Sequence, residues 1–263
     1  MLLLVPPASA DGVNVGDPSA LRNLIPAADL ERQAATQYVQ MEQQATSQGA
    51  LVSATNPETQ RLVGIATRIL PFTERWNPRE KEWKWEINLI RSKQINAFCM
   101  PGGKIAFYTG LLDTLQLSDD EVAIVMGHEI AHALREHARA RLAKARLTHV
   151  GTYLLGAYFG GGTFSSVFSL GGNLLTLAFS RENETEADIV GLDLAARSGF
   201  DPHAGVTLWQ KMTATNRGAP PQWLSTHPAG ANRIQEIEKH LPEVLPLYEQ
   251  AHADPKSPAS KVR

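Results

Sequence analysis

Cysteine is almost absent from this 263-residue chain, and Cys99 alone cannot form a disulfide within it. Because Phe98 and Met100 flank Cys99, we interpret it as a buried or half-buried thiol. Neither sign of charge dominates, since 25 Lys and Arg residues balance 27 Asp and Glu residues. The sequence has no basic patch that would indicate a nucleic-acid partner and no acidic run that would indicate a charged tail. The hydrophobic content of 43% is enough for one sizeable core.

The first residues predict export through an incomplete signal peptide. Ala8, Ser9 and Ala10 fit the small-residue rule for signal-peptide cleavage. The apolar run before them covers only residues 2–5, and no charged segment precedes it. A start codon assigned too far downstream would explain both features. We therefore predict a periplasmic protein, and the alternative is a disordered tail on a cytoplasmic one.

The spacing of apolar residues predicts two early helices, followed by three short strands. The helices cover residues 27–48 and 56–75, where apolar residues recur three and four apart. The period then changes to two, which is typical of strands. The expected strands are 83–90, 94–100 and 104–109. We expect a small antiparallel sheet, whose exposed edge could bind an extended peptide or serve only as a packing platform.

These elements predict an α+β fold that is mainly α-helical. We expect one domain over residues 26–250. A signal-peptide remnant and linker would precede it at 1–25, and a disordered tail rich in Pro, Lys and Ser would follow at 251–263.

Residues 122–134 contain the pattern His-Glu-x-x-His. His128 and His132 are four residues apart, so on a helix their imidazoles lie on one face, close enough to bind one metal ion. Glu129 projects about 100° further round the helix, where it can reach a water at the metal's open position. Such an arrangement is typical of zinc hydrolases.

The residues before the motif support this interpretation. Ser118 and Glu121 form a capping box, so the helix begins about ten residues before the histidines and is expected to fade near Lys144. The motif's neighbours are uncharged, which places it inside the protein. The alternative is a core helix with two satisfied histidines. That alternative is unfavourable, because an unpaired buried carboxylate such as Glu129 costs several kcal/mol.

A third protein ligand is needed. Position 138, where a metzincin has its third histidine, holds Ala138. His137 is one residue out of that register, and we predict that it is structural and faces away from the metal. Among the glutamates of residues 180–188 we favour Glu184, because Asp188 lies four residues later on the same helical face and could accept a hydrogen bond from a ligand imidazole. The alternative is an ordinary solvated acidic helix.

An uncharged stretch lies between these two motifs. Residues 150–180 contain no Asp, Glu, Lys or Arg. Glycines at 160–162 and 171–172 interrupt it, whereas a membrane-spanning helix needs about 20 mainly apolar residues in a row. We predict two short buried helices or a flexible flap beside the active site, with peripheral membrane contact as the alternative.

Four motifs together resemble those of the HtpX/BepA-type zinc metallopeptidases, which are gluzincins related to the CaaX-prenyl-protease metallopeptidases. The resemblance covers residues 31–240. The motifs are, in chain order, Asn96-Ala97-Phe98 with Pro101-Gly102-Gly103, then His128-Glu129-Ile130-Ala131-His132, then Glu184-x-x-x-Asp188-x-x-Gly191, then His227-Pro228 with Arg233.

The resemblance implies one Zn²⁺ per chain held by His128, His132 and Glu184. It also implies that Glu129 is the general base and that Asp188 supports a ligand. Unlike the membrane-embedded relatives or those with helical repeats, this chain resembles the compact, soluble members.

Three further roles follow from the resemblance. The strand that contains Asn96, Ala97 and Phe98 would run beside the substrate. His227 and Arg233 would approach the zinc from a loop and the following helix. From the residues alone, His227 could instead cap that helix.

We therefore predict a zinc-dependent endopeptidase that hydrolyses unfolded or misassembled polypeptides in protein quality control. Glu129 would take a proton from the attacking water. Either His227 or Arg233 would stabilise the oxyanion, or His227 would fill the open metal position and keep the enzyme latent. The alternative function is a zinc-stabilised chaperone or assembly factor with latent or incidental proteolysis.

Overall fold

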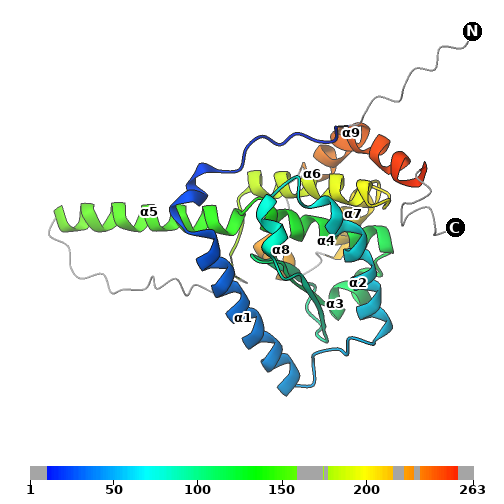
Figure 1. The fold of residues 1–263 in the computed structure, drawn as a ribbon, viewed down its shortest axis with the longest axis horizontal. Coiled ribbons are helices and arrows are strands. Elements are labelled where there is room, and N and C mark those ends of the chain that lie inside the picture. Colours follow the sequence, from blue (N-terminus) through cyan, green and yellow to red (C-terminus); the bar gives the residue numbers. More distant parts are fainter. Residues whose placement is uncertain (1–10, 159–173, 175–176, 216–221, 228–231, 254–263) are drawn as a thin grey trace, which may run out of the picture.

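The computed structural model describes residues 11–158, 174, 177–215, 222–227 and 232–253 (Figure 1). Within these residues the chain is mainly helical, with one small sheet, as the sequence predicts. The helices are α1 (Ala27–Ser47), α2 (Pro57–Ile69), α3 (Thr109–Leu115), α4 (Asp119–Leu134), α5 (His137–Tyr158), α6 (Arg181–Arg197), α7 (Ala204–Thr215), α8 (Gln222–Thr226) and α9 (Arg233–Ala253). Short 3₁₀ turns cover Ala20–Leu24, Leu70–Phe72 and Pro78–Glu82. The strands are β1 (Glu86–Ile90), β2 (Ala97–Met100) and β3 (Lys104–Tyr108).

The sheet is mixed, so the prediction of an antiparallel sheet is wrong for one of its two strand pairs. The strand order is β1-β3-β2, with β2 antiparallel and β1 parallel to β3. Gly102 and Gly103, at φ +85° and +80°, close the tight β2–β3 hairpin. The hairpin makes β2 and β3 antiparallel. Because β1 runs in the opposite direction to β2, β3 runs parallel to β1. Strand β2 is left at one edge of the sheet.

Helix α4 is the centre of the core. Its first turn is capped as predicted, since the Ser118 side chain accepts a hydrogen bond from the Glu121 backbone while the Glu121 side chain accepts one from the Ser118 backbone. From Glu121 to Leu134 the whole helix is buried. In Figure 1, α4 and α6 lie side by side at the middle of the molecule.

Two glycines set the distance between α4 and α6. A Cβ atom on Gly127 would lie 2.7 Å from the Gly191 carbonyl oxygen, and one on Gly191 would lie 2.7 Å from the His128 backbone nitrogen. Such distances are shorter than van der Waals contact. The two helix backbones therefore touch, and this contact brings the side chains of both helices to one place.

Helix α4 ends ten residues earlier than the sequence predicts. Glu136 has φ +56°, a left-handed conformation that breaks the helix, and a new helix begins at His137. The Asn77 side chain donates to the Leu134 carbonyl at 3.0 Å and so satisfies the end of α4. Helix α5 then extends away from the rest of the fold (Figure 1).

Residues 11–16, part of the segment predicted as a linker, lie against α6. The Val13 backbone donates to Asp193 Oδ2 at 3.2 Å, and Val13 is buried. The Asp11 carbonyl accepts hydrogen bonds from Arg75 and Arg197, each at 2.9 Å. We call residues 11–16 the N-terminal strap.

Part of the uncharged stretch lies outside the described residues. The prediction of two short helices or a flap falls mostly on residues 159–173 and 175–176, and most of the expected tail falls on 254–263. In the part of the chain that the structure describes, α5 included, we find no helix with the length and apolar character needed to span a membrane.

Candidate metal centre

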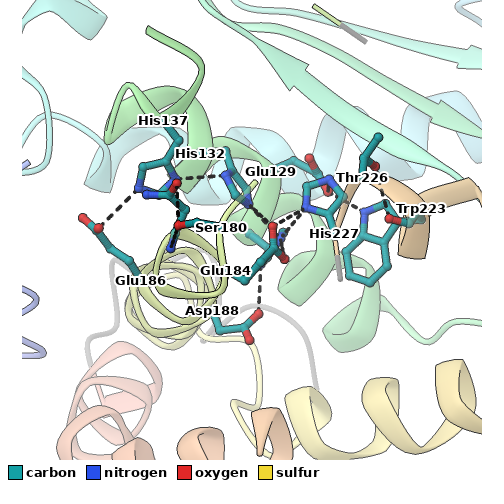
Figure 2. A network of polar contacts seen from close by, with 12 residues as sticks. Glu129, His132, His137, Ser180, Glu184, Glu186, Asp188, Trp223, Thr226 and His227 are labelled. Carbon is teal, nitrogen blue, oxygen red and sulfur yellow. Dashed lines mark hydrogen bonds and ion pairs between the residues drawn. The ribbon is translucent and has the colours of Figure 1, made fainter. Parts of the chain in front are cut away.

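Four buried side chains converge at one point. His128 and His132 come from α4, Glu184 from α6, and His227 follows α8 (Figure 2). Each offers one donor atom, and the four atoms lie within 4.8 Å of one another. The His128 and His132 Nε2 atoms are 3.1 Å apart, and His227 Nδ1 lies 3.2 Å from His128 Nε2 and 3.0 Å from Glu184 Oε1.

The chemistry of these donors fits zinc. The His128 Nδ1 atom lies 2.9 Å from Asp188 Oδ1, so this nitrogen carries the proton and Nε2 presents a lone pair to the cluster. Burial lowers the pKa of His132 well below its ordinary value, which favours the neutral ring that a metal requires. Imidazole nitrogens and a carboxylate are the ligands that zinc prefers. His128, His132 and Glu184 could therefore hold the ion, as the resemblance implies, with His227 as a fourth donor.

Arg233 holds the carboxylates of the cluster. Its Nε donates to Asp188 Oδ2 at 2.7 Å, and its Nη1 donates to Glu184 Oε2 at 2.6 Å. The guanidinium carbon lies 3.7 Å from the centre of the Trp209 ring, which covers it. Burial alone would raise the pKa of Asp188, but the charge of Arg233 and the hydrogen bond with His128 lower it. Asp188 is therefore ionised and can orient His128.

Glu129 lies at the edge of the cluster and is held by a tryptophan. The Trp223 Nε1 group donates to Glu129 Oε1 at 2.6 Å, and His227 Nε2 lies 3.6 Å from the same oxygen. The Trp223 ring also stacks on the His227 ring at 5.1 Å. Trp223 was not among the predicted site residues. Its spacing of four residues from His227 is the signal that could have suggested it.

The prediction that His137 faces away from the metal site is wrong. Its Nδ1 lies 2.9 Å from Nδ1 of His132. The prediction assumed one continuous helix, whereas the left-handed residue Glu136 turns the chain before α5 begins. Phe179 stacks on the His132 ring, with ring centres 4.0 Å apart, and no spacing in the sequence pointed to it.

The predicted substrate strand runs past the cluster. Asn96, Ala97 and Phe98 line a narrow cavity of about 40 Å³ that also reaches Glu129 and His132. Ala97 is buried, and the Phe98 ring packs against the Tyr38 and Tyr108 rings.

Cys99 is half-buried, as predicted. Burial raises the pKa of its thiol well above the ordinary value.

This chain is similar in sequence to known metallopeptidases. Residues 33–241 match the model of peptidase family M48. The mitochondrial metalloendopeptidase OMA1 of Schizosaccharomyces pombe is 40% identical over 162 residues, which is 61% of this chain and 48% of the relative. From Escherichia coli, metalloprotease LoiP is 32% identical over 57% of this chain and 60% of its own length. The beta-barrel assembly-enhancing protease is 34% identical over 63% and 36%. The chain thus spans between about a third and three fifths of these relatives.

Proposed function

Because the chain belongs to peptidase family M48, we propose that it is a zinc-dependent endopeptidase that hydrolyses unfolded or misassembled polypeptides. The observation that carries the proposal is the convergence of His128, His132 and Glu184 beside the carboxylate of Glu129. Three protein ligands plus a neighbouring carboxylate are the requirement for hydrolysis at a zinc site.

The residues around the cluster divide the chemical work. Zinc, when bound, polarises the scissile carbonyl and makes water a better nucleophile at neutral pH. Glu129 accepts a proton from the attacking water and delivers it to the leaving amine. Trp223 fixes the Glu129 carboxylate through its 2.6 Å hydrogen bond. The ring nitrogen of Trp223 cannot accept a proton in return, so it orients the base without competing with it.

Arg233 supports catalysis through the two carboxylates that it binds. Its Nε and Nη1 atoms are engaged by Asp188 and Glu184, and its Nη2 also contacts Asp188. These contacts favour a positioning role for Arg233 over the stabilisation of an oxyanion, which was the predicted alternative.

His227 would keep the resting enzyme latent by offering Nδ1 as a fourth donor to the metal. Its Nδ1 lies among the ligand atoms, 3.2 Å from His128 Nε2 and 3.0 Å from Glu184 Oε1. His227→Ala should then raise the rate of peptide cleavage, because the substrate would no longer have to displace the imidazole from the metal. A lower rate would instead assign His227 to stabilisation of the oxyanion.

The edge of β2 supports a polypeptide substrate in extended form. The strand pairs with β3 on one side, and its residues Ala97–Met100 line the narrow cavity that reaches Glu129 and His132. An extended chain could add to this edge by backbone hydrogen bonds, which are independent of side-chain identity. Such recognition suits unfolded proteins, and a quality-control role agrees with the similarity to the E. coli beta-barrel assembly-enhancing protease.

The test is Glu129→Gln in the full chain. Cleavage of casein should fall by about 10²–10⁴-fold, the usual contribution of a general base, while the zinc content stays unchanged. Undiminished cleavage would remove Glu129 from the mechanism. Complementation of a deletion strain separates this function from a chaperone, since full rescue by Glu129→Gln would favour binding over hydrolysis.

We also propose export to the periplasm. The support is Ala8-Ser9-Ala10, which fits a signal-peptide cleavage site. The OMA1 relatives are named as mitochondrial, so the compartment differs within the family. Fractionation of cells that express the gene from its natural start would test the location.

A further inference from the structure

One zinc ligand is supported by a short chain of polar contacts that ends on an arginine. Asp188 Oδ1 lies 2.9 Å from Nδ1 of His128, and Arg233 binds both oxygens of that carboxylate. Arg233 is 5% exposed, so its charge is poorly screened by solvent. A carboxylate that is itself held in place fixes both the orientation and the tautomer of a metal-binding imidazole.

The other histidine ligand has a longer chain of the same kind. Nδ1 of His132 lies 2.9 Å from Nδ1 of His137, whose Nε2 lies 3.3 Å from Glu186 Oε2 (Figure 2). Arg135 donates from Nε to the other oxygen of Glu186. Arg135 and His137 are as buried as the metal ligands, at 4% and 3% exposure. Each ligand imidazole is therefore connected, directly or through one ring, to a carboxylate held by a buried arginine.

We propose that His137, backed by Glu186, is a positioning residue that fixes the ring and tautomer of the zinc ligand His132. The inference rests on the proposed function and assigns a second support for its metal site.

The direction of the hydrogen bonds follows from the positions of the nitrogens. His132 can bind a metal through Nε2 only if Nδ1 carries the proton, and the group that faces this proton is Nδ1 of His137. His137 Nδ1 must then be unprotonated, which leaves its own proton on Nε2. That nitrogen is buried and makes no hydrogen bond to the described residues, and the acceptor that the structure places beside it is Glu186 Oε2, at an ion-pair distance of 3.3 Å. Glu186 thus selects one tautomer of His137, and His137 in turn selects one tautomer of His132.

Local structure holds His137 in this position. The left-handed residue Glu136 lets the chain turn, so the first residue of α5 meets the last turn of α4. Arg22 and Arg139 form ion pairs with Glu136 at 3.1 and 2.7 Å, which secures the turn. The His132 ring also stacks on Phe179, with ring centres 4.0 Å apart. The His132 ring is therefore held by a stacked aromatic ring on one face and by His137 at its Nδ1 edge.

The experiment measures zinc affinity by chelator competition in the full chain. The His137→Leu variant keeps the volume but removes the acceptor, and its zinc affinity should fall by about 10–100-fold, the usual loss when a partner of a ligand is removed. The His137→Asn variant places an amide oxygen near the original Nδ1, so its affinity should return to within a few fold of wild type. The Glu186→Gln variant should lie between these two. Glu182→Gln is the matched control on the exposed first turn of α6, and its affinity should equal that of wild type.

The second readout is the visible spectrum of the cobalt-substituted protein, which reports ligand geometry without any activity. The spectrum should change in His137→Leu and be restored in His137→Asn. Equal zinc affinity and an unchanged cobalt spectrum in His137→Leu would overturn the inference. An equal loss in His137→Leu and His137→Asn would also overturn it, because the acceptor would then be irrelevant. These outcomes are distinct from failure of the proposed function, in which wild type itself would bind no zinc and cleave no casein.

Discussion

At the scale of single residues, the contact between Trp223 and Glu129 has a measurable consequence. A buried carboxylate that transfers protons needs one orientation, and the Trp223 N–H donates to it at 2.6 Å. Trp223→Phe keeps the ring that stacks on His227 but removes this donor. A hydrogen bond to a charged group contributes about 1.5–3 kcal/mol. We expect the rate of casein cleavage to fall by about 10–100-fold, with the zinc content unchanged.

Trp209 provides the control for that substitution. It is another buried tryptophan beside the site, with its ring 5.4 Å from that of Trp223. The Trp209 ring stacks on the Arg233 guanidinium, whereas Trp223 donates the hydrogen bond to Glu129. Trp209→Phe should retain most of the cleavage rate. Equal losses in the two variants would mean that ring packing, and not the hydrogen bond, maintains activity.

The residues that the sequence could predict are those whose spacing lies within one helix. His128 and His132 share a face of α4, and Glu184 and Asp188 share a face of α6, so the pattern alone indicates each pair. Trp223, Phe179 and His137 reach the site through contacts between distant segments or across a helix break. For Trp223 the four-residue spacing from His227 was a weak signal. No spacing rule describes the contacts of Phe179 and His137, so the sequence could not indicate those two residues.

At the scale of elements, the first turn of α4 makes stability depend on pH. Burial would raise the pKa of Glu121, but hydrogen bonds from Lys211, the Ser118 backbone and Thr207 lower it below its ordinary value. An acid whose pKa is lower in the folded state stabilises the protein above its unfolded pKa, near 4.5, and this stabilisation is lost as the pH falls through the folded pKa.

Lys211→Met should therefore reduce the free energy of unfolding at pH 7 by about 1 kcal/mol, a modest value because Lys211 is partly exposed. The deficit should shrink at pH 3.5, below the ordinary pKa of a glutamate, because the unfolded chain then binds a proton that the folded chain resists. Urea unfolding at both pH values measures it. Lys239→Met removes an exposed ion pair with Glu236 in α9 and should change stability by less than about 0.5 kcal/mol at either pH. A deficit in Lys211→Met that did not vary with pH would contradict the electrostatic explanation.

The contact between α4 and α6 predicts a large effect for one added methyl group. Gly127→Ala would press a Cβ against the Gly191 backbone at 2.7 Å, so the helices must separate. Overpacking of a core costs about 1–3 kcal/mol. The separation should also weaken zinc binding, because His128 and Glu184 come from these two helices. Thermal unfolding and chelator competition would show both losses.

The matched control is Gly64→Ala in α2. Gly64 is exposed and has nothing within 4 Å of an added Cβ, so the substitution should stabilise the helix by about 0.5–1 kcal/mol. If both glycine variants raised the melting temperature, the helices would have room that the structure does not show.

Elements whose ends carry a chemical signal were predictable, and those whose geometry depends on the chain path were not. Ser118 and Glu121 marked the start of α4 correctly. Its end was missed because Glu136, which adopts the left-handed conformation, is not a glycine or an asparagine. The direction of β1 was missed because it depends on the insertion of β3 between β1 and β2.

At the scale of the whole molecule, the N-terminal strap ties elements that are far apart in the sequence. Asp11 binds Arg75 and Arg197, and the Gly16 carbonyl accepts a hydrogen bond from Arg135 at 2.7 Å. Gly12 has φ +78°, and a Cβ there would lie 2.1 Å from Asp193 Oδ2. Gly12→Ala should therefore release the strap. The free energy of unfolding should fall by about 1–3 kcal/mol, which lowers the melting temperature by several degrees.

Gly16→Ala separates this clash from simple backbone strain. Gly16 also has a positive φ, +72°, but an added Cβ meets nothing within 4 Å. Both variants carry the same conformational penalty, so the difference between their melting temperatures reports the contact with Asp193. Equal melting temperatures would show that the strap adds little to stability.

The touching backbones of α4 and α6 bear on any attempt to build this centre into another scaffold. A transplant of His128, His132 and Glu184 alone would fail, because an ordinary helix pair keeps its axes 8–10 Å apart through intervening side chains. The recipient scaffold must first have a glycine on each helix at the point where the two helices cross, as Gly127 and Gly191 do here. The unit that must be transferred is therefore the close crossing of the two helices, because this crossing determines where the three ligands lie.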